Sequence, residues 1–198
     1  ASMLKDGLFQ TILDTQCFDL EAVDSLRANP RHVEMSASFY ANPHNKACTA
    51  HITDIMMLGA TEIDLGFNVN VLTGSDGIMM GALGGHPDTA AGTKLRLVTA
   101  PLIRGRFPIV VDRVHTVVTP GECVDVLVTE RGTAVNPARP ELKKRLEQAG
   151  IRTVSIEELQ ARAEKLTGKP DDLELGDEVV AVVEYRDGTL IDTVRRVL

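Results

Sequence analysis

The 198-residue chain is 43% hydrophobic and carries a formal net charge of −7. This length can bury one substantial core but is short for two ordinary domains, so we expect a single domain over residues 1–198. The negative charge, without a cluster of lysine and arginine, argues against a nucleic-acid-binding surface. No apolar run reaches the length of a membrane span and the first residues do not resemble a signal peptide, so we expect no membrane partner and a soluble cytoplasmic protein.

The composition favours an α/β fold. With no Trp, two Tyr and five Phe, the chain must build its core mainly from aliphatic side chains. Residues 55–58 and 109–111 are continuous apolar runs, which are typical of strands buried on both faces of a parallel sheet.

Helix caps and alternating patterns define the first sixty or so residues. Asp19 is the expected N-cap of a helix over residues 20–28, and residues 32–36 alternate as in a short strand. A mainly apolar strand over residues 52–58 then runs into the polar segment 61–64. Such a junction between strand and loop is where α/β proteins place their chemistry.

Two glycine-rich loops follow. Residues 68–72 alternate as a strand and stop at the first loop, residues 73–77, and the second loop covers residues 81–88. Glycine-rich loops leave backbone N–H groups free to face an anion or a thioester oxygen. Further strands are predicted at residues 95–100, 109–112, 116–118 and 124–129.

The remainder of the chain predicts two helices and a hairpin. One helix begins at Pro140 and ends before Gly150. A second follows the N-cap Ser155, with Glu158 completing a capping-box pattern. Two strands within residues 178–197 flank an Asp-Gly turn, which is the chemistry of a β-hairpin.

The second glycine loop adjoins two polar side chains, His86 and Asp88. Its spacing fits neither a dinucleotide-binding fingerprint nor a P-loop, so it is either a set of tight turns or an anion-binding loop. His86 and Asp88 are candidates for a base and its orienting partner, for metal ligands, or for ordinary hydrogen-bonded loop residues. No further ligand cluster lies nearby, so we expect no metal site.

Carboxylates and guanidinium groups provide further candidates. Glu62 and Asp64 lie at the end of a strand. Each is either a dehydrated carboxylate that acts as a nucleophile or general base, or a solvated loop acid. Arg104 and Arg106 flank Gly105 and either clamp a carboxylate or lie in a solvated turn.

The cysteines and serines do not indicate a catalytic nucleophile. Cys17, Cys48 and Cys123 are far apart and have no histidine at ligand spacing, so we expect free, mostly buried thiols, with Cys17 buried and inert. No serine lies in a G-x-S-x-G motif, which argues against a serine hydrolase.

Longer strings resemble the citrate lyase α subunit family, in order and over essentially the whole chain. They are SFYANP at 38–43, LGATEID at 58–64, NVNVLTGSDG at 68–77, GGHPDTAAG at 84–92, VLVTERG at 126–132 and VEYRDG at 183–188. A more distant resemblance is to the second half of the 3-oxoacid CoA-transferases. The nucleophilic glutamate motif of those relatives, Ser-Glu-Asn-Gly, is absent, so the resemblance does not make Glu62 a covalent nucleophile.

The resemblance implies a CoA-transferase-like fold, a three-layer α/β/α sandwich with a mostly parallel or mixed open sheet. It implies a transferase that converts acetyl-carrier and citrate into citryl-carrier and acetate, with an acyl-carrier or CoA thioester as substrate and no bound cofactor. The catalytic candidates are Gly84, Gly85, His86 and Glu62. The substrate-binding candidates are Asn68, Asn70, Gly74, Ser75, Asp76, Gly77, Asp88, Arg104 and Arg106.

The resemblance also implies partners. The chain would be the C-terminal half of its subunit, and the expected partners are the upstream half, the citrate lyase β subunit and the acyl carrier protein (γ subunit). Two other functions remain open: a non-catalytic half that assembles the complex, and a CoA-transferase that uses a free CoA thioester.

Overall fold

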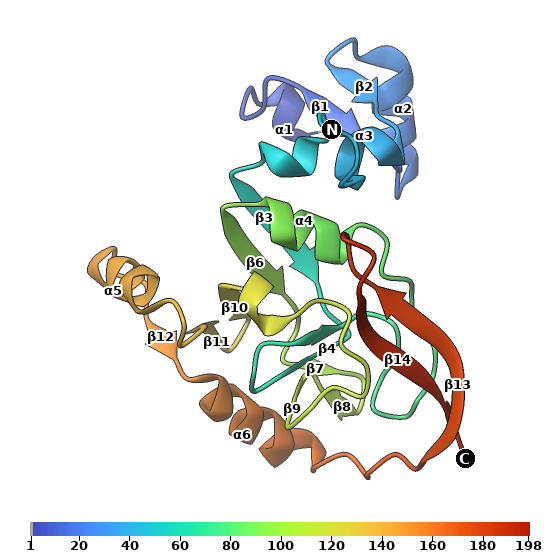
Figure 1. Ribbon diagram of the computed structural model, residues 1–198. Coiled ribbons are helices and arrows are strands. Elements are labelled where there is room, and N and C mark those ends of the chain that lie inside the picture. Colours follow the sequence, from blue (N-terminus) through green and yellow to red (C-terminus); the bar gives the residue numbers. More distant parts are fainter. Residues whose placement is uncertain (1) are drawn as a thin grey trace.

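A computed structural model describes residues 2–198 (Figure 1). The first fifty or so residues form small elements that lie together at the top of the view, beyond the α4 helix. Asp19 caps the second helix by accepting a hydrogen bond from the Ala22 N–H at 2.7 Å, as predicted. The elements are α1 (Ser2–Lys5), β1 (Ile12–Asp14), α2 (Leu20–Ala28), β2 (His32–Glu34), α3 (Ala37–Ala41) and the 3-10 helix η1 (Thr49–His51).

A five-stranded sheet forms the centre of the molecule. Its strand order is β12-β11-β10-β6-β3, and β3, β6 and β10 are mutually parallel, whereas β11 runs antiparallel to β10. The fold is therefore mixed α/β with an open sheet, as predicted. The strands are β3 (Ile55–Gly59), β6 (Leu95–Thr99), β10 (Val126–Thr129), β11 (Gly132–Val135) and β12 (Thr153–Val154).

The edge strand β3 corrects one prediction. Met56 is 2% exposed, whereas Ile55 and Met57 on the opposite face are 51% and 67% exposed. The continuous apolar run at 55–58 is therefore buried on one face only, because residues 2–198 supply no cover for the other face at this strand. The similar prediction for Ile109, Val110 and Val111 is confirmed, since all three are buried.

A second, smaller sheet lies against the first. It has the order β5-β4-β9, with β5 (Val69–Asn70), β4 (Glu62–Asp64) and β9 (Val110–Val111), and a short hairpin, β7 (Ile103–Arg104) and β8 (Phe107–Pro108), accompanies it. The polar segment after β3 is thus a buried strand rather than a loop. Residues 116–118, predicted as a strand, lie outside any strand, although the Val118 N–H bonds to the Val69 carbonyl.

Three helices pack around these sheets. Helix α4 (His86–Gly92) covers β3 through Ala90 and Met56, and it corrects the prediction of a loop over the start of this segment. The helices α5 (Pro140–Gln148) and α6 (Ile156–Thr167) follow the prediction, and Ser155 caps α6 by accepting from the Glu158 N–H.

A long hairpin closes the chain. Strands β13 (Leu175–Glu184) and β14 (Leu190–Val197) pair antiparallel around a turn in which Gly188 has φ +86°, as the Asp-Gly pair predicted. No helix within residues 2–198 is both long enough and apolar enough to cross a bilayer.

All three cysteines are free thiols. Cys48 and Cys123 are buried as predicted, but Cys17 is only half-buried, and its thiol donates a hydrogen bond to the Asp14 carboxylate at 3.0 Å. The prediction of a buried Cys17 is therefore wrong.

Candidate functional site

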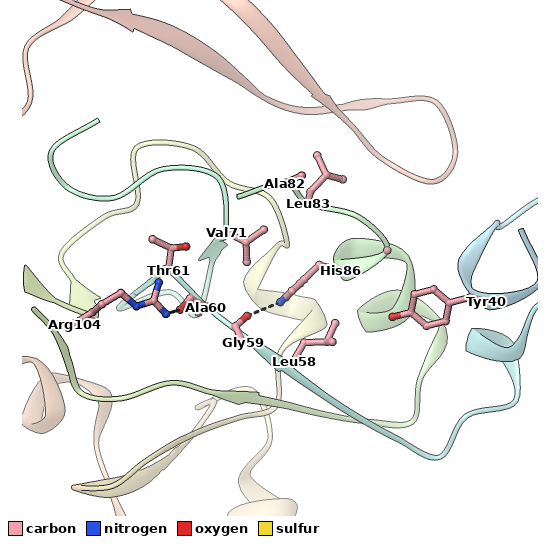
Figure 2. Close-up of a pocket in the computed structure, with 11 residues that line it drawn as sticks. Tyr40, Leu58, Gly59, Ala60, Thr61, Val71, Ala82, Leu83, His86 and Arg104 are labelled. Atoms are coloured by element: carbon pink, nitrogen blue, oxygen red, sulfur yellow. Dashed lines mark hydrogen bonds between the residues drawn. The ribbon is translucent and has the colours of Figure 1, made fainter. Parts of the chain in front are cut away.

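A pocket of about 340 Å³ lies at the carboxyl end of β3 (Figure 2). The end of a parallel strand is a common location for ligand sites in α/β proteins. Three of the predicted residues, Gly85, His86 and Arg104, line this pocket. The complete lining consists of Tyr40, Leu58, Gly59, Ala60, Thr61, Val71, Ala82, Leu83, Gly85, His86 and Arg104.

The second glycine loop supplies free hydrogen-bond donors at this pocket. The backbone N–H groups of Ala82, Leu83, Gly84 and Gly85 donate no hydrogen bond within residues 2–198. Gly84 has φ +51°, a left-handed conformation that glycine adopts at little cost. The loop can therefore present several N–H groups to an oxyanion or a carboxylate.

Gly85 fixes the position of this loop against helix α3. A Cβ atom added to Gly85 would lie 2.8 Å from the Ala41 Cβ and 2.9 Å from the Tyr40 Cε1, so only glycine fits without displacing its neighbours. The Tyr40 hydroxyl in turn accepts a hydrogen bond from Thr89 at 2.9 Å. The sequence did not point to Tyr40, because its contact with the loop joins segments far apart in the chain.

His86 is buried, and both ring nitrogens have partners inside the protein. Its Nε2 lies 3.0 Å from the Gly59 carbonyl, as Figure 2 shows, and its Nδ1 lies 2.7 Å from the Thr119 hydroxyl. A carbonyl only accepts, so Nε2 carries the proton and Nδ1 accepts from Thr119. Burial lowers the pKa of His86, which keeps the ring neutral. His86 therefore ties α4 to the end of β3 instead of donating to a substrate.

Arg104 lies between two pockets. Its Nη2 donates to the Ala60 carbonyl at 2.9 Å, which holds the guanidinium beside the 340 Å³ pocket (Figure 2). It also lines a neighbouring pocket of about 230 Å³ together with Arg106, Glu62 and Ser75. The structure thus brings both arginines near the predicted carboxylate, with Gly105 turning the β7–β8 hairpin at φ +60°.

Glu62 is a buried acid, not a solvated one. The side chain is 2% exposed, the Ser75 hydroxyl donates a hydrogen bond to Oε1, and Oε2 has no partner within residues 2–198. Burial raises the pKa of Glu62, and the hydrogen bonds from Ser75 offset only part of that effect. The group is therefore held toward its neutral, protonated form.

We expect Glu62→Gln to remove a pH-dependent penalty on folding. Below the ordinary pKa of 4.5, Glu62 is protonated in both states. As the pH rises above that value, the unfolded chain releases this proton before the folded one, so the wild type loses up to about 1.4 kcal/mol per pH unit until the raised pKa is passed. Thermal unfolding measured from pH 4 to 8 should show that the melting temperature of the variant, relative to that of the wild type, rises with pH. A difference that does not change with pH would contradict this prediction.

The neighbouring polar residues shape the loops. The Asp64 carboxylate accepts from the backbone N–H groups of Gly66 and Asn68 and from the Asn68 amide, and the Asn68 Oδ1 accepts from the Gly121 N–H. Asn70 is fully buried, and its amide bonds to Leu72 and Thr73. These side chains use their polar groups within the protein and hold the strand ends in place.

The first glycine loop is also internally bonded. The Gly77 N–H donates to the Gly74 carbonyl at 3.0 Å, and the Gly74 N–H donates to the Ile78 carbonyl. Asp76 accepts from the Ile78 N–H, and Gly77 has φ +73°. Gly74, Ser75 and Asp76 still line the 230 Å³ pocket, but Gly74 and Gly77 have no free N–H group to offer.

Asp88 lies away from the 340 Å³ pocket. It lines a different pocket, of about 690 Å³, and its Oδ1 lies 3.8 Å from the Arg186 Nε. Burial raises the pKa of Asp88, and the positive charge of Arg186 acts in the opposite direction. Asp88 and His86 therefore line different pockets, although both lie in the first turn of α4.

Comparisons with known proteins identify the family of this chain. The sequence model of the family "Citrate lyase, alpha subunit (CitF)" matches residues 1–197. The citrate lyase alpha chain of Klebsiella pneumoniae is 58% identical over 96% of this chain, and that of Escherichia coli is 56% identical over the same share. The chain spans 38% of each relative's length, in the C-terminal part, which is less than the half that we expected.

A solved structure gives the same result. The alpha subunit of citrate lyase from Streptococcus mutans, in complex with citrate, matches with a TM-score of 0.91 and 48% sequence identity. The match covers all of this chain and 39% of that one. The chain belongs to the citrate lyase α subunit family.

Proposed function

We propose that this chain forms part of a transferase that exchanges the acyl-carrier thioester between acetate and citrate. The observation that carries the proposal is the pocket at the end of β3, which is lined by Ala82, Leu83 and Gly85, whose N–H groups are free within residues 2–198, and by Arg104. A pocket with such donors suits a substrate that has several carboxylates and a reaction that forms an oxyanion. Family membership and the citrate-bound relative support the same assignment.

The proposed reaction has two acyl-transfer steps. A citrate carboxylate oxygen attacks the acetyl thioester carbonyl, the C–S bond breaks, and a mixed anhydride and the carrier thiolate form. The thiolate then attacks the citryl carbonyl of the anhydride, and acetate leaves. Each step passes through a tetrahedral oxyanion, and one preorganised donor to such an oxyanion contributes about 2.7–4 kcal/mol.

The residues take different roles in this proposal. The N–H groups of the second glycine loop stabilise the oxyanion, and Arg104 and Arg106 bind citrate carboxylates. His86 is a positioning residue, because its ring nitrogens already bond to Thr119 and Gly59. Glu62 anchors the first glycine loop through Ser75, and it lines the neighbouring pocket with a carboxyl whose pKa is raised by burial.

Further partners are part of the proposal. The chain corresponds to 38% of its curated relatives, so we propose that the rest of an α subunit completes the pocket. The carrier-bound thioester would come from the acyl carrier subunit and the citryl product would pass to the β subunit. The exposed face of β3, with Ile55 and Met57, supports a further covering segment.

The first test is acetyl-to-citryl exchange on the carrier thioester. We expect no exchange with this chain alone and exchange after the upstream part of an α subunit is added. Exchange by this chain alone would show that the catalytic set lies entirely within residues 1–198. A clear preference for free acetyl-CoA over the acetylated carrier would favour the CoA-dependent alternative.

The exposed face of β3 also supports a second candidate function, assembly of the complex. In that case this chain would bind the upstream part or the β subunit while the chemistry lies elsewhere. Charged substitutions at Ile55 and Met57 would then abolish complex formation, whereas Arg104→Ala would leave exchange unchanged in the assembled complex. A loss of exchange with intact assembly in Arg104→Ala would exclude this candidate.

A further inference from the structure

Three potential metal ligands meet in the first fifty residues, away from the proposed transfer pocket. They are Asp14 at the end of β1, Cys17 three residues later, and His32 at the start of β2. One ligand atom of each residue lies within 4.8 Å of the others. The sequence did not predict this cluster, because His32 lies fifteen positions after Cys17, which is not a ligand spacing of the common zinc motifs.

The parallel pairing of β1 with β2 brings the ligands together. Ile12 pairs with His32 and Asp14 pairs with Glu34, so Asp14 and His32 lie on the same face of the two-stranded sheet. The Gln16 N–H donates to Asp14 Oδ1 at 3.0 Å and turns the chain, which brings Cys17 back to the carboxylate. The backbone therefore determines the cluster, not chance contacts of long side chains.

The cysteine sulfur and the histidine nitrogen both lie close to one oxygen of the Asp14 carboxylate. The Cys17 Sγ lies 3.0 Å from Asp14 Oδ2, and the His32 Nε2 lies 3.1 Å from the same oxygen. Sulfur, nitrogen and oxygen ligands around a tetrahedral zinc ion lie roughly 3.3–3.6 Å apart, given metal–ligand distances of about 2.0–2.3 Å. The two contacts to Asp14 Oδ2 would lengthen by a few tenths of an ångström to admit the ion, and the third separation already lies within 4.8 Å.

The second ring nitrogen of His32 also has the partner that a metal ligand needs. Nδ1 lies 3.1 Å from the Ser25 hydroxyl, and the imidazole side chain is only 2% exposed. A hydrogen bond from Nδ1–H to Ser25 leaves the lone pair of Nε2 directed at the ion, an arrangement that most metal-binding histidines share. Asp14 lines the 690 Å³ pocket, which gives a hydrated ion access to the carboxylate.

We propose that Asp14, Cys17 and His32 form a zinc site with a fourth position open to water. The mixed nitrogen, sulfur and oxygen set suits zinc better than magnesium or calcium, which take oxygen ligands. Three protein ligands and an open position are typical of zinc sites that hold water or a further ligand. The bound ion would join the loop after β1 to the start of β2.

Zinc and cobalt titrations of this chain test the proposal. After incubation with Zn²⁺ and desalting, we expect about one zinc per chain in the wild type and a loss of at least about tenfold in affinity for Cys17→Ser and Asp14→Asn. Co²⁺ should give a sulfur-to-metal charge-transfer absorption that Cys17→Ser abolishes. The matched control Cys48→Ala, which changes a cysteine outside the cluster, should keep both signals.

Cys17→Ser keeps a hydroxyl for the Asp14 carboxylate, so the variant should fold, and circular dichroism would verify this. His32 is buried, so His32→Gln serves only as a further variant if it folds. Absence of binding in the wild type, or equal binding by the wild type, Cys17→Ser and Asp14→Asn, would overturn the proposal.

Discussion

Replacing Asp125 by alanine is expected to lower the free energy of unfolding by about 3–5 kcal/mol. The Asp125 carboxylate is 3% exposed and receives two hydrogen bonds from the Arg96 guanidinium, both at 2.8 Å, and one from Arg139 at 2.6 Å. It also accepts from the Arg96 backbone N–H. The alanine variant would leave Arg96, which is itself largely buried, without its counter-charge.

The free energy of unfolding of the wild type should depend on pH through the Asp125 carboxylate. Burial alone would raise the pKa of Asp125, but the hydrogen bonds and charge of Arg96 outweigh it and hold the pKa below its usual value. The stabilisation is thus present above the ordinary pKa of 3.8 and is lost as the pH falls through the lower, folded-state value. Acid unfolding of Asp125→Ala should lack this contribution.

An exposed pair provides the matched control. Asp54 and Lys94 form an ion pair at 2.7 Å with both side chains more than three-quarters exposed, so solvent screens the pair and Asp54→Ala should lower the free energy of unfolding far less than Asp125→Ala does. Urea unfolding of the two variants measures the difference directly. Equal losses for Asp125→Ala and Asp54→Ala would mean that the buried arginine–aspartate cluster does not stabilise the fold in this way.

Local patterns predicted the elements that local chemistry determines. Asp19 and Ser155 cap the helices that follow them, and the Asp-Gly pair turns the β13–β14 hairpin. Helix α4 was missed because its first turn follows a glycine cluster. Pro87 in that first turn was the available signal, since proline is favoured at the start of a helix.

Long-range partners determine the features that the sequence did not reveal. Glu62 and Asp64 are polar, which argued for a loop, but Ser75 and the turn ending at Asn68 supply the hydrogen bonds that allow these acids to lie in a buried strand. The exposed face of β3 could not be inferred either, because an apolar run at 55–58 is equally consistent with one buried face or two.

The candidate site was predicted in part. The second glycine loop and Arg104 were identified from their composition and spacing, and they line one pocket. The two glycine loops differ in the hydrogen bonding of their backbone N–H groups. The N–H groups of Gly74 and Gly77 bond within a turn, whereas the N–H groups of Ala82 to Gly85 remain free within residues 2–198. No sequence pattern distinguishes these two states, because both loops have the same glycine-rich character.

Replacing Gly85 by valine is expected to reduce the acetyl-to-citryl exchange rate by about 10²-fold in the complete transferase. The added side chain would meet Tyr40 and Ala41 at distances under 3.0 Å, so the loop must move away from α3. A displacement of about 1 Å would misplace the N–H groups of the loop relative to the reacting carbonyl, and misplacements of that size cost about this factor in rate.

Gly150→Ala is the matched control that separates a displaced loop from a general loss of stability. Gly150 lies at the end of α5, outside the 340 Å³ pocket, and no atom lies within 4 Å of a Cβ added there, but its φ of +81° should cost the variant roughly 1 kcal/mol of stability. We therefore expect a lower melting temperature with nearly unchanged exchange for Gly150→Ala, and slow exchange for Gly85→Val even at temperatures where it is fully folded. Full activity in folded Gly85→Val would remove the second glycine loop from the transfer site, because the N–H groups that stabilise the oxyanion cannot tolerate such a shift.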